Sequence, residues 1–324
     1  MKKQLILLFP CLLTLMSCGG GDEKITTWQI PSDKECELLL KEPISVNDIS
    51  LTNQLEVDIQ LALEVASPTH AHQLFLRNKE EFMSWVKDGH ELSIATHETN
   101  HSFDKKLAWC NGSDSPNYFL NGNYYDIGYN LFHTAHYSIV EQTIPEHLKQ
   151  RSRYQYYIEG LKGANGNKFH LLLDELVAYI GDGGFQLDYI KSGQNLYPGS
   201  FRPFSTLQVD GAVDMMLYVQ YYLKSARLNY PDTYVTINNE ETIAAIQAIW
   251  HEAEAMLTRA YPYLVEQKAA GEISIFFDNQ NGNLSALDIL KAVYSDDALF
   301  ELDELDIQHA EYNDWQSSYL SFDN

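Results

Sequence analysis

The pentapeptide His97-Glu98-Thr99-Asn100-His101 constrains the folding of this 324-residue chain more than any other feature of its sequence. Its two histidines are four positions apart in a segment without proline or glycine. On a helix this spacing stacks the imidazoles one turn apart, so both can coordinate a single Zn²⁺. Glu98 projects from the same turn, where its carboxylate can act as a general base on a water bound to the metal. We therefore expect a helix over residues 91–106 that carries this group.

The pattern resembles the His-Glu-x-x-His motif of the zincin metallopeptidases, over a few tens of residues at most. The resemblance implies a bound zinc ion, Glu98 as the catalytic base, and hydrolysis of peptide or protein substrates. The residues after His101 contain neither the glycine nor the third histidine of the metzincin form. A gluzincin-like arrangement is therefore favoured. The alternative is a surface helix with two ordinary histidines.

A catalytic zinc needs a third protein ligand and an open position. The gluzincin-like resemblance implies a glutamate on a later helix, and Glu175 is the best candidate. It lies in an amphipathic segment, residues 168–180, which we expect to end at the glycine-rich run 181–184. A carboxylate flanked by leucines and valine is costly to bury without a partner, and a metal ion would be one. The alternative is an ordinary glutamate at the edge of an exposed stripe.

Two supporting roles can also be proposed from the sequence. Asp104 is three residues after His101, so it can accept the free N–H of a ligating imidazole, bind the metal directly, or be solvated. A peptidase also needs a donor that stabilises the oxyanion. The candidates for that donor lie in a segment rich in tyrosine and histidine: Tyr124, Tyr125, Tyr129, His133, His136 and Tyr137.

The first residues predict export. Lys2 and Lys3 precede an apolar stretch, residues 5–16, that is too short to span a bilayer but has the length of a signal-peptide core. The tetrapeptide that ends at Cys18 resembles the lipobox of bacterial lipoproteins. This resemblance implies a signal peptide over 1–17, lipidation of Cys18, a tether over 18–33, and a lipid-anchored address in the bacterial envelope, with the outer membrane favoured.

Composition narrows the possible partners. The formal net charge of −23 repels nucleic acid and anionic lipid, so we expect no nucleic-acid partner and membrane contact only through the lipid anchor. Cys36 and Cys110 remain once Cys11 leaves with the signal peptide and Cys18 is lipidated. Two thiols in an oxidising compartment suggest one disulfide, Cys36–Cys110.

The remaining pattern predicts an α+β fold that is predominantly helical. Alternation over residues 55–65 predicts a strand, and Asn121-Gly122 predicts the type I′ turn of a hairpin within 117–128. We expect one zincin-like catalytic domain over 34–324, with a possible helical C-terminal subdomain from about residue 205. The competing hypothesis is a non-enzymatic envelope lipoprotein that serves as a ligand-binding or assembly module.

Overall fold

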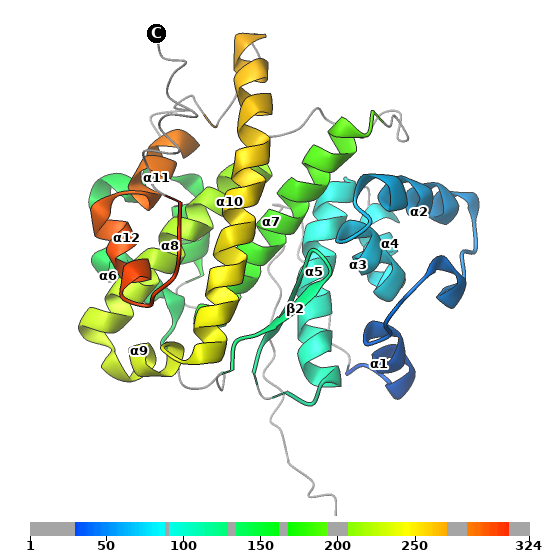
Figure 1. Ribbon diagram of the computed structural model, residues 1–324, viewed down its shortest axis with the longest axis horizontal. Helices are drawn as coiled ribbons and strands as arrows, with labels where there is room; N and C mark the ends of the chain where they lie inside the picture. The colour runs from blue at the N-terminus through cyan, green and yellow to red at the C-terminus, as the bar shows by residue number, and fades with distance from the viewer. Residues whose placement is uncertain are drawn as a thin grey trace, which may run out of the picture.

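The computed structural model describes residues 30–87, 91–113, 115–128, 134–161, 168–193, 207–270, 276 and 284–310. These residues are predominantly helical and contain one two-stranded antiparallel sheet, which confirms the α+β class (Figure 1). The expected signal peptide, Cys18 and most of the expected tether lie outside the described residues. No helix in the described parts of the chain is both long and apolar enough to cross a bilayer.

The first half of the chain supplies short helices around one longer helix. These elements are α1 (Asp33–Leu39), the 3₁₀ helix η1 (Val46–Asp48), α2 (Gln54–Ala66), α3 (Ala71–Arg77), α4 (Lys79–Lys87) and α5 (Leu92–Cys110). The second half contains three long helices. Its elements are η3 (Tyr137–Ile139), α6 (Val140–Thr143), η4 (Glu146–Gln150), the π-helix η5 (Tyr154–Gly160), α7 (Phe169–Lys191), α8 (Leu207–Asn229), α9 (Pro231–Ile237), α10 (Glu240–Ala269), α11 (Ala286–Val293) and α12 (Asp296–Asp303).

The segment expected as a strand over 55–65 is the helix α2, so that prediction was wrong. The side chain of Asn53 caps the helix by accepting a hydrogen bond from the backbone N–H of Glu56. Leu61 and Val65, which the alternation placed on a buried face, are 50% and 59% exposed. The segment is rich in leucine, glutamate, glutamine and alanine, whose helix propensity favours α2 over a strand.

The hairpin forms where the sequence predicts it. Strands β1 (Asn117–Leu120) and β2 (Asn123–Asp126) pair antiparallel. Asn121 and Gly122 connect them with φ values of 51° and 85°, as a type I′ turn requires. All of β1 is buried, whereas most of β2 faces solvent. The sheet therefore covers one side of the helical core.

Helix α7 does not end at the glycine-rich run 181–184, as expected, but continues to Lys191. A Cβ atom on Gly181 would lie 2.0 Å from Nε2 of the buried His70, and one on Gly183 would lie 3.1 Å from the sulfur of Met256. These glycines therefore allow two neighbouring side chains to approach the helix axis, and the glycines do not terminate the helix.

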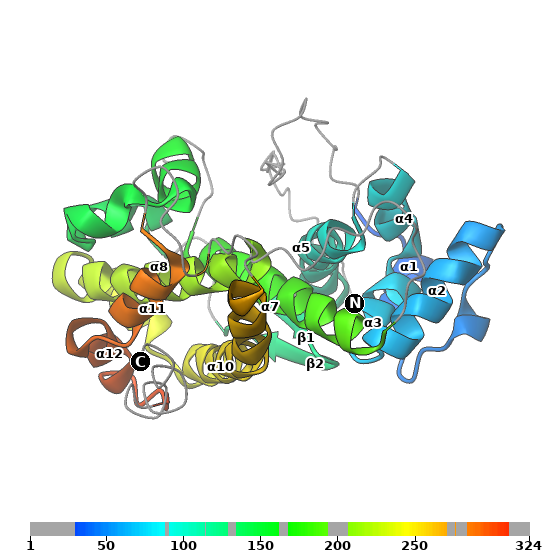
Figure 2. The same cartoon turned by 90° about the horizontal axis from the view of Figure 1, so that it is seen from above.

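Helix α7 runs between the two halves of the molecule (Figures 1 and 2). Near its start, Leu173 and Leu176 join the largest hydrophobic cluster, which also includes β1, α8, α10 and α11. Near its end, Phe185 and Tyr189 join a second cluster formed with α2 to α5. The helical subdomain expected from about residue 205 shares its core with α7.

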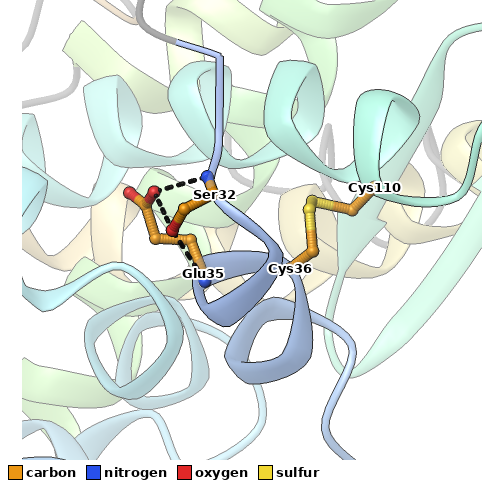
Figure 3. Close-up of a disulfide and its surroundings, with 4 residues drawn as sticks. All are labelled: Ser32, Glu35, Cys36 and Cys110. Atoms are coloured by element: carbon orange, nitrogen blue, oxygen red, sulfur yellow. Dashed lines mark hydrogen bonds between the residues drawn. A yellow bond between two sulfur atoms is a disulfide. The ribbon is translucent and has the colours of Figure 1, made fainter.

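Cys36 and Cys110 form a disulfide with an S–S distance of 2.07 Å (Figure 3). The bond joins α1 to the last residue of α5. Ser32 and Glu35 fix the start of α1 through a reciprocal capping box, which Figure 3 shows beside the disulfide. The N-terminal end of the described chain is therefore fastened to the helix that carries the histidine motif.

Candidate metal centre

Helices α5 and α7 pack side by side and bring the three predicted ligands together. One ligand atom each from His97, His101 and Glu175 lies within 4.8 Å of the other two. The two Nε2 atoms are 3.2 Å apart. Oε2 of Glu175 is 3.6 Å from Nε2 of His97 and 3.7 Å from Nε2 of His101. This cluster, which we call the His-His-Glu cluster, can hold a metal ion.

The spacing of the cluster matches the demands of a small divalent cation. Zinc bonds of about 2.0–2.1 Å in a tetrahedron place neighbouring ligand atoms about 3.3 Å apart. Neutral imidazole nitrogens and a carboxylate oxygen are all electron-pair donors, so they repel one another at this distance unless a positive charge lies between them. In the zinc-free protein a proton on His101 supplies that charge. A cation between them removes that repulsion, and the donor set therefore fits a metal ion.

A second carboxylate on α7 orients His101. Nδ1 of His101 lies 2.8 Å from Oδ2 of the buried Asp174. Donation of the Nδ1 hydrogen to this carboxylate leaves the lone pair of Nε2 facing the His-His-Glu cluster. Asp182, also on α7 and also buried, has a carboxylate oxygen 3.9 Å from Nδ1 of His97. The same helix thus supplies one ligand and an acidic neighbour for each histidine.

Asp104 takes none of the three roles that the sequence left open. Asp174 accepts from His101 in its place, and Asp104 lies outside the His-His-Glu cluster and is buried. The carboxyl group of Asp104 accepts hydrogen bonds from the side-chain amide of Asn100, at 3.0 Å, and from the backbone N–H of Phe119, at 2.8 Å. Burial and the neighbouring Asp174 carboxylate raise the pKa of Asp104 well above its usual range. Asp104 therefore links α5 to β1 and lies one step further from the cluster than Asp174.

The charges within the cluster favour metal binding by the glutamate. Burial alone would raise the pKa of Glu175, but His101 and His97 outweigh it and hold that pKa well below its usual range. Burial likewise opposes protonation of His101, but Asp174 and Glu175 outweigh it and raise its pKa well above the usual range. Glu175 is therefore an anionic carboxylate over the whole physiological range of pH.

Glu98 lies on the same turn as His97 and is only 6% exposed. Among the described residues it has no hydrogen-bond or ion-pair partner. A carboxylate without a protein partner on this helix face is free to accept a hydrogen bond from a bound water or substrate group. This is the environment expected of a general base that acts on a ligand.

A hydrogen-bond chain reaches the cluster from the π-helix η5. Tyr157 donates to Oε2 of Glu175 at 3.0 Å, and its hydroxyl lies 2.9 Å from that of Tyr179. Arg153 donates to the Tyr179 hydroxyl at 3.3 Å. The ring of Tyr179 packs edge-on against His97, with centroids 4.7 Å apart. Tyr157 therefore places a phenol hydroxyl against the carboxylate of the His-His-Glu cluster.

The tyrosine-rich segment expected to supply an oxyanion donor does not contact the cluster in its described part. Tyr124 donates to Glu42, and His136 bonds to Ser138. Tyr129 and His133 lie outside the described residues. No local pattern points to Tyr157, because it meets Glu175 only once η5 packs against α7.

Comparison with protein families, with curated proteins and with solved structures finds no match to this chain. We therefore argue its function from the geometry of the metal centre.

Proposed function

We propose that this protein is a zinc-dependent hydrolase, a metallopeptidase of gluzincin-like type with a zincin-like fold. The observation that carries the proposal is the convergence of His97, His101 and Glu175 at tetrahedral spacing, with the unpaired Glu98 on the same helix as the two histidines. Two histidines and one carboxylate leave a fourth position open, which is the ligand set of catalytic rather than structural zinc.

The residues of this chain take the following roles in the proposed hydrolysis of a peptide bond. Bound zinc supplies Lewis-acid chemistry, polarising the scissile carbonyl and acidifying the attacking water. Glu98 accepts a proton from that water as its oxygen bonds to the carbonyl carbon. Glu98 then delivers the proton to the amide nitrogen as the C–N bond breaks, which releases an acid and an amine. The hydroxyl of Tyr157 donates to Glu175 in this structure, and we propose that it turns from that carboxylate to donate to the oxygen that becomes negative.

The test is zinc content and peptide turnover of three proteins: wild type, His97→Ala and Glu98→Gln. We expect about one zinc per wild-type chain, loss of zinc in His97→Ala, and retained zinc without turnover in Glu98→Gln. Turnover by Glu98→Gln would contradict the proposal. An intact wild-type fold that binds no zinc would favour the non-enzymatic binding or assembly module.

We further propose that the enzyme is a lipoprotein of the bacterial envelope, anchored through Cys18. The sequence before residue 20 supports this address, and the disulfide between Cys36 and Cys110 suits an oxidising compartment. Metabolic labelling with an alkyne analogue of palmitate should mark the wild-type protein. A Cys18→Ala variant that is labelled equally would contradict the anchor.

A further inference from the structure

Lys105 lies on the metal-binding helix at a position that the mechanism does not use. It is one turn after His101 and two turns after Glu98, so all three residues share one face of α5. Its side chain is half-buried. Within the part of the chain that the structure describes, the Lys105 ammonium makes no hydrogen bond or ion pair.

The carboxylates near Lys105 are already engaged elsewhere. Asp174 accepts from His101, Glu175 is a metal ligand, and Asp104 is bound by Asn100 and Phe119. Burial lowers the pKa of Lys105, while these carboxylates and Glu98 oppose that shift and favour the ammonium form. The net shift is downward, but the Lys105 side chain lies on the same face of α5 as Glu98 and His101 and has no partner there among the described residues, so it is available to a ligand.

The next residue, Lys106, is also half-buried, and its ammonium has a partner within the chain. Lys106 donates a hydrogen bond to the side chain of Asn78, at 2.9 Å. Lys105 has no such contact, although half-burial deprives its ammonium of part of its hydration. The difference indicates that the Lys105 ammonium group interacts with a ligand outside the chain.

We infer that Lys105 binds a carboxylate of the substrate close to the scissile amide. The inference rests on the proposed function and narrows it to peptides that carry a negative charge next to the bond that is cut. The net charge of −23 disfavours anionic ligands over most of the surface, so a local cation is needed to select them. The carboxylate can be a free C-terminus or an acidic side chain, since both offer the same oxygens to an ammonium.

A competition assay on the purified, zinc-loaded protein tests this inference. A mixed-sequence library of N-acetylated peptides that lack Asp and Glu is supplied in two forms, with a C-terminal carboxylate and with a C-terminal amide. A third set consists of peptides whose last residue is aspartate or glutamate, with a free acidic side chain and an amidated C-terminus. This set separates recognition of a side-chain carboxylate from recognition of the C-terminal carboxylate. Mass spectrometry gives the ratio of kcat/KM values between sets. Lys105→Met is compared with Lys106→Met, which removes the same charge one position away, and with Lys105→Arg, which retains it.

We expect wild type and Lys106→Met to favour one carboxylate-bearing set over uncharged amides by about 10–100-fold. Lys105→Met should reduce that ratio to about one, while Lys105→Arg keeps most of it. An unchanged ratio in Lys105→Met overturns the inference, because a purely structural lysine affects all peptides alike. If wild type cleaves all three peptide sets equally well, the inference about Lys105 is wrong but the proposed function stands. If no set shows zinc-dependent cleavage, the proposed function itself is wrong, and the inference with it.

Discussion

Replacing Asp174 by asparagine tests whether the carboxylate behind His101 supports metal binding. Asp174 and His101 are both buried and 2.8 Å apart. Asparagine has the same shape and can still accept from Nδ1, but it lacks the charge. A hydrogen bond to a charged group contributes about 1.5–3 kcal/mol and a neutral one about 0.5–1.5 kcal/mol. The midpoints of these ranges differ by about 1.25 kcal/mol, which predicts roughly eightfold weaker zinc binding.

Competition with a chromogenic zinc chelator measures this change directly. The matched control is Asp188→Asn, which removes the same charge from the same helix at a half-exposed site paired with Arg259. We expect the control to bind zinc as tightly as wild type. Equal zinc affinity in Asp174→Asn and wild type would refute the role assigned to Asp174. Equal losses in both variants would point to a general effect of charge and refute it as well.

Three further predictions concern stability. Gly181→Ala should destabilise the fold by about 1–3 kcal/mol, because the new methyl group would collide with His70. Gly184→Ala on the same helix has open space around the methyl group and should stabilise the fold by about 0.5–1 kcal/mol. Urea unfolding measures both changes. The raised pKa of His101 stabilises the zinc-free fold fully below about pH 6.5, and this contribution is lost as pH rises through the folded-state pKa. Zinc needs the neutral imidazole, so the zinc-induced rise in Tm should be larger at about pH 8 than at about pH 6. Finally, Cys36→Ser should lower the free energy of unfolding by about 2–4 kcal/mol, and reductant should have no effect on that variant.

The histidine motif and the hairpin were predictable because their signals are local. A separation of four residues places His97 and His101 on one helix face whatever the rest of the chain does, and Asn121-Gly122 favours its turn in any context. Glu175 could be proposed because a carboxylate within an apolar helix face needs a partner. Asp174, which precedes it on the same helix, carries a similar signal.

The errors have two causes: a local helix signal that was outweighed by the alternation, and tertiary packing that no local pattern reveals. Residues 55–65 alternate like a strand, but their composition and the Asn53 cap favour a helix. The run 181–184 resembles the end of a helix. Its glycines instead leave room for the side chains of His70 and Met256, and no local pattern in the sequence reveals these contacts. Tyr157 was likewise not predicted, since its contact with Glu175 depends on how η5 packs against α7.

The placement of α7 in both large hydrophobic clusters has a consequence for the cooperativity of folding. Leu176 is buried in one cluster and Phe185 in the other, so losing either core exposes apolar surface on the same helix. The slowest amide hydrogens of α2 and of α10 should therefore exchange with solvent through one shared opening event. A ligand that ties α5 to α7 would slow exchange at both ends of the molecule together.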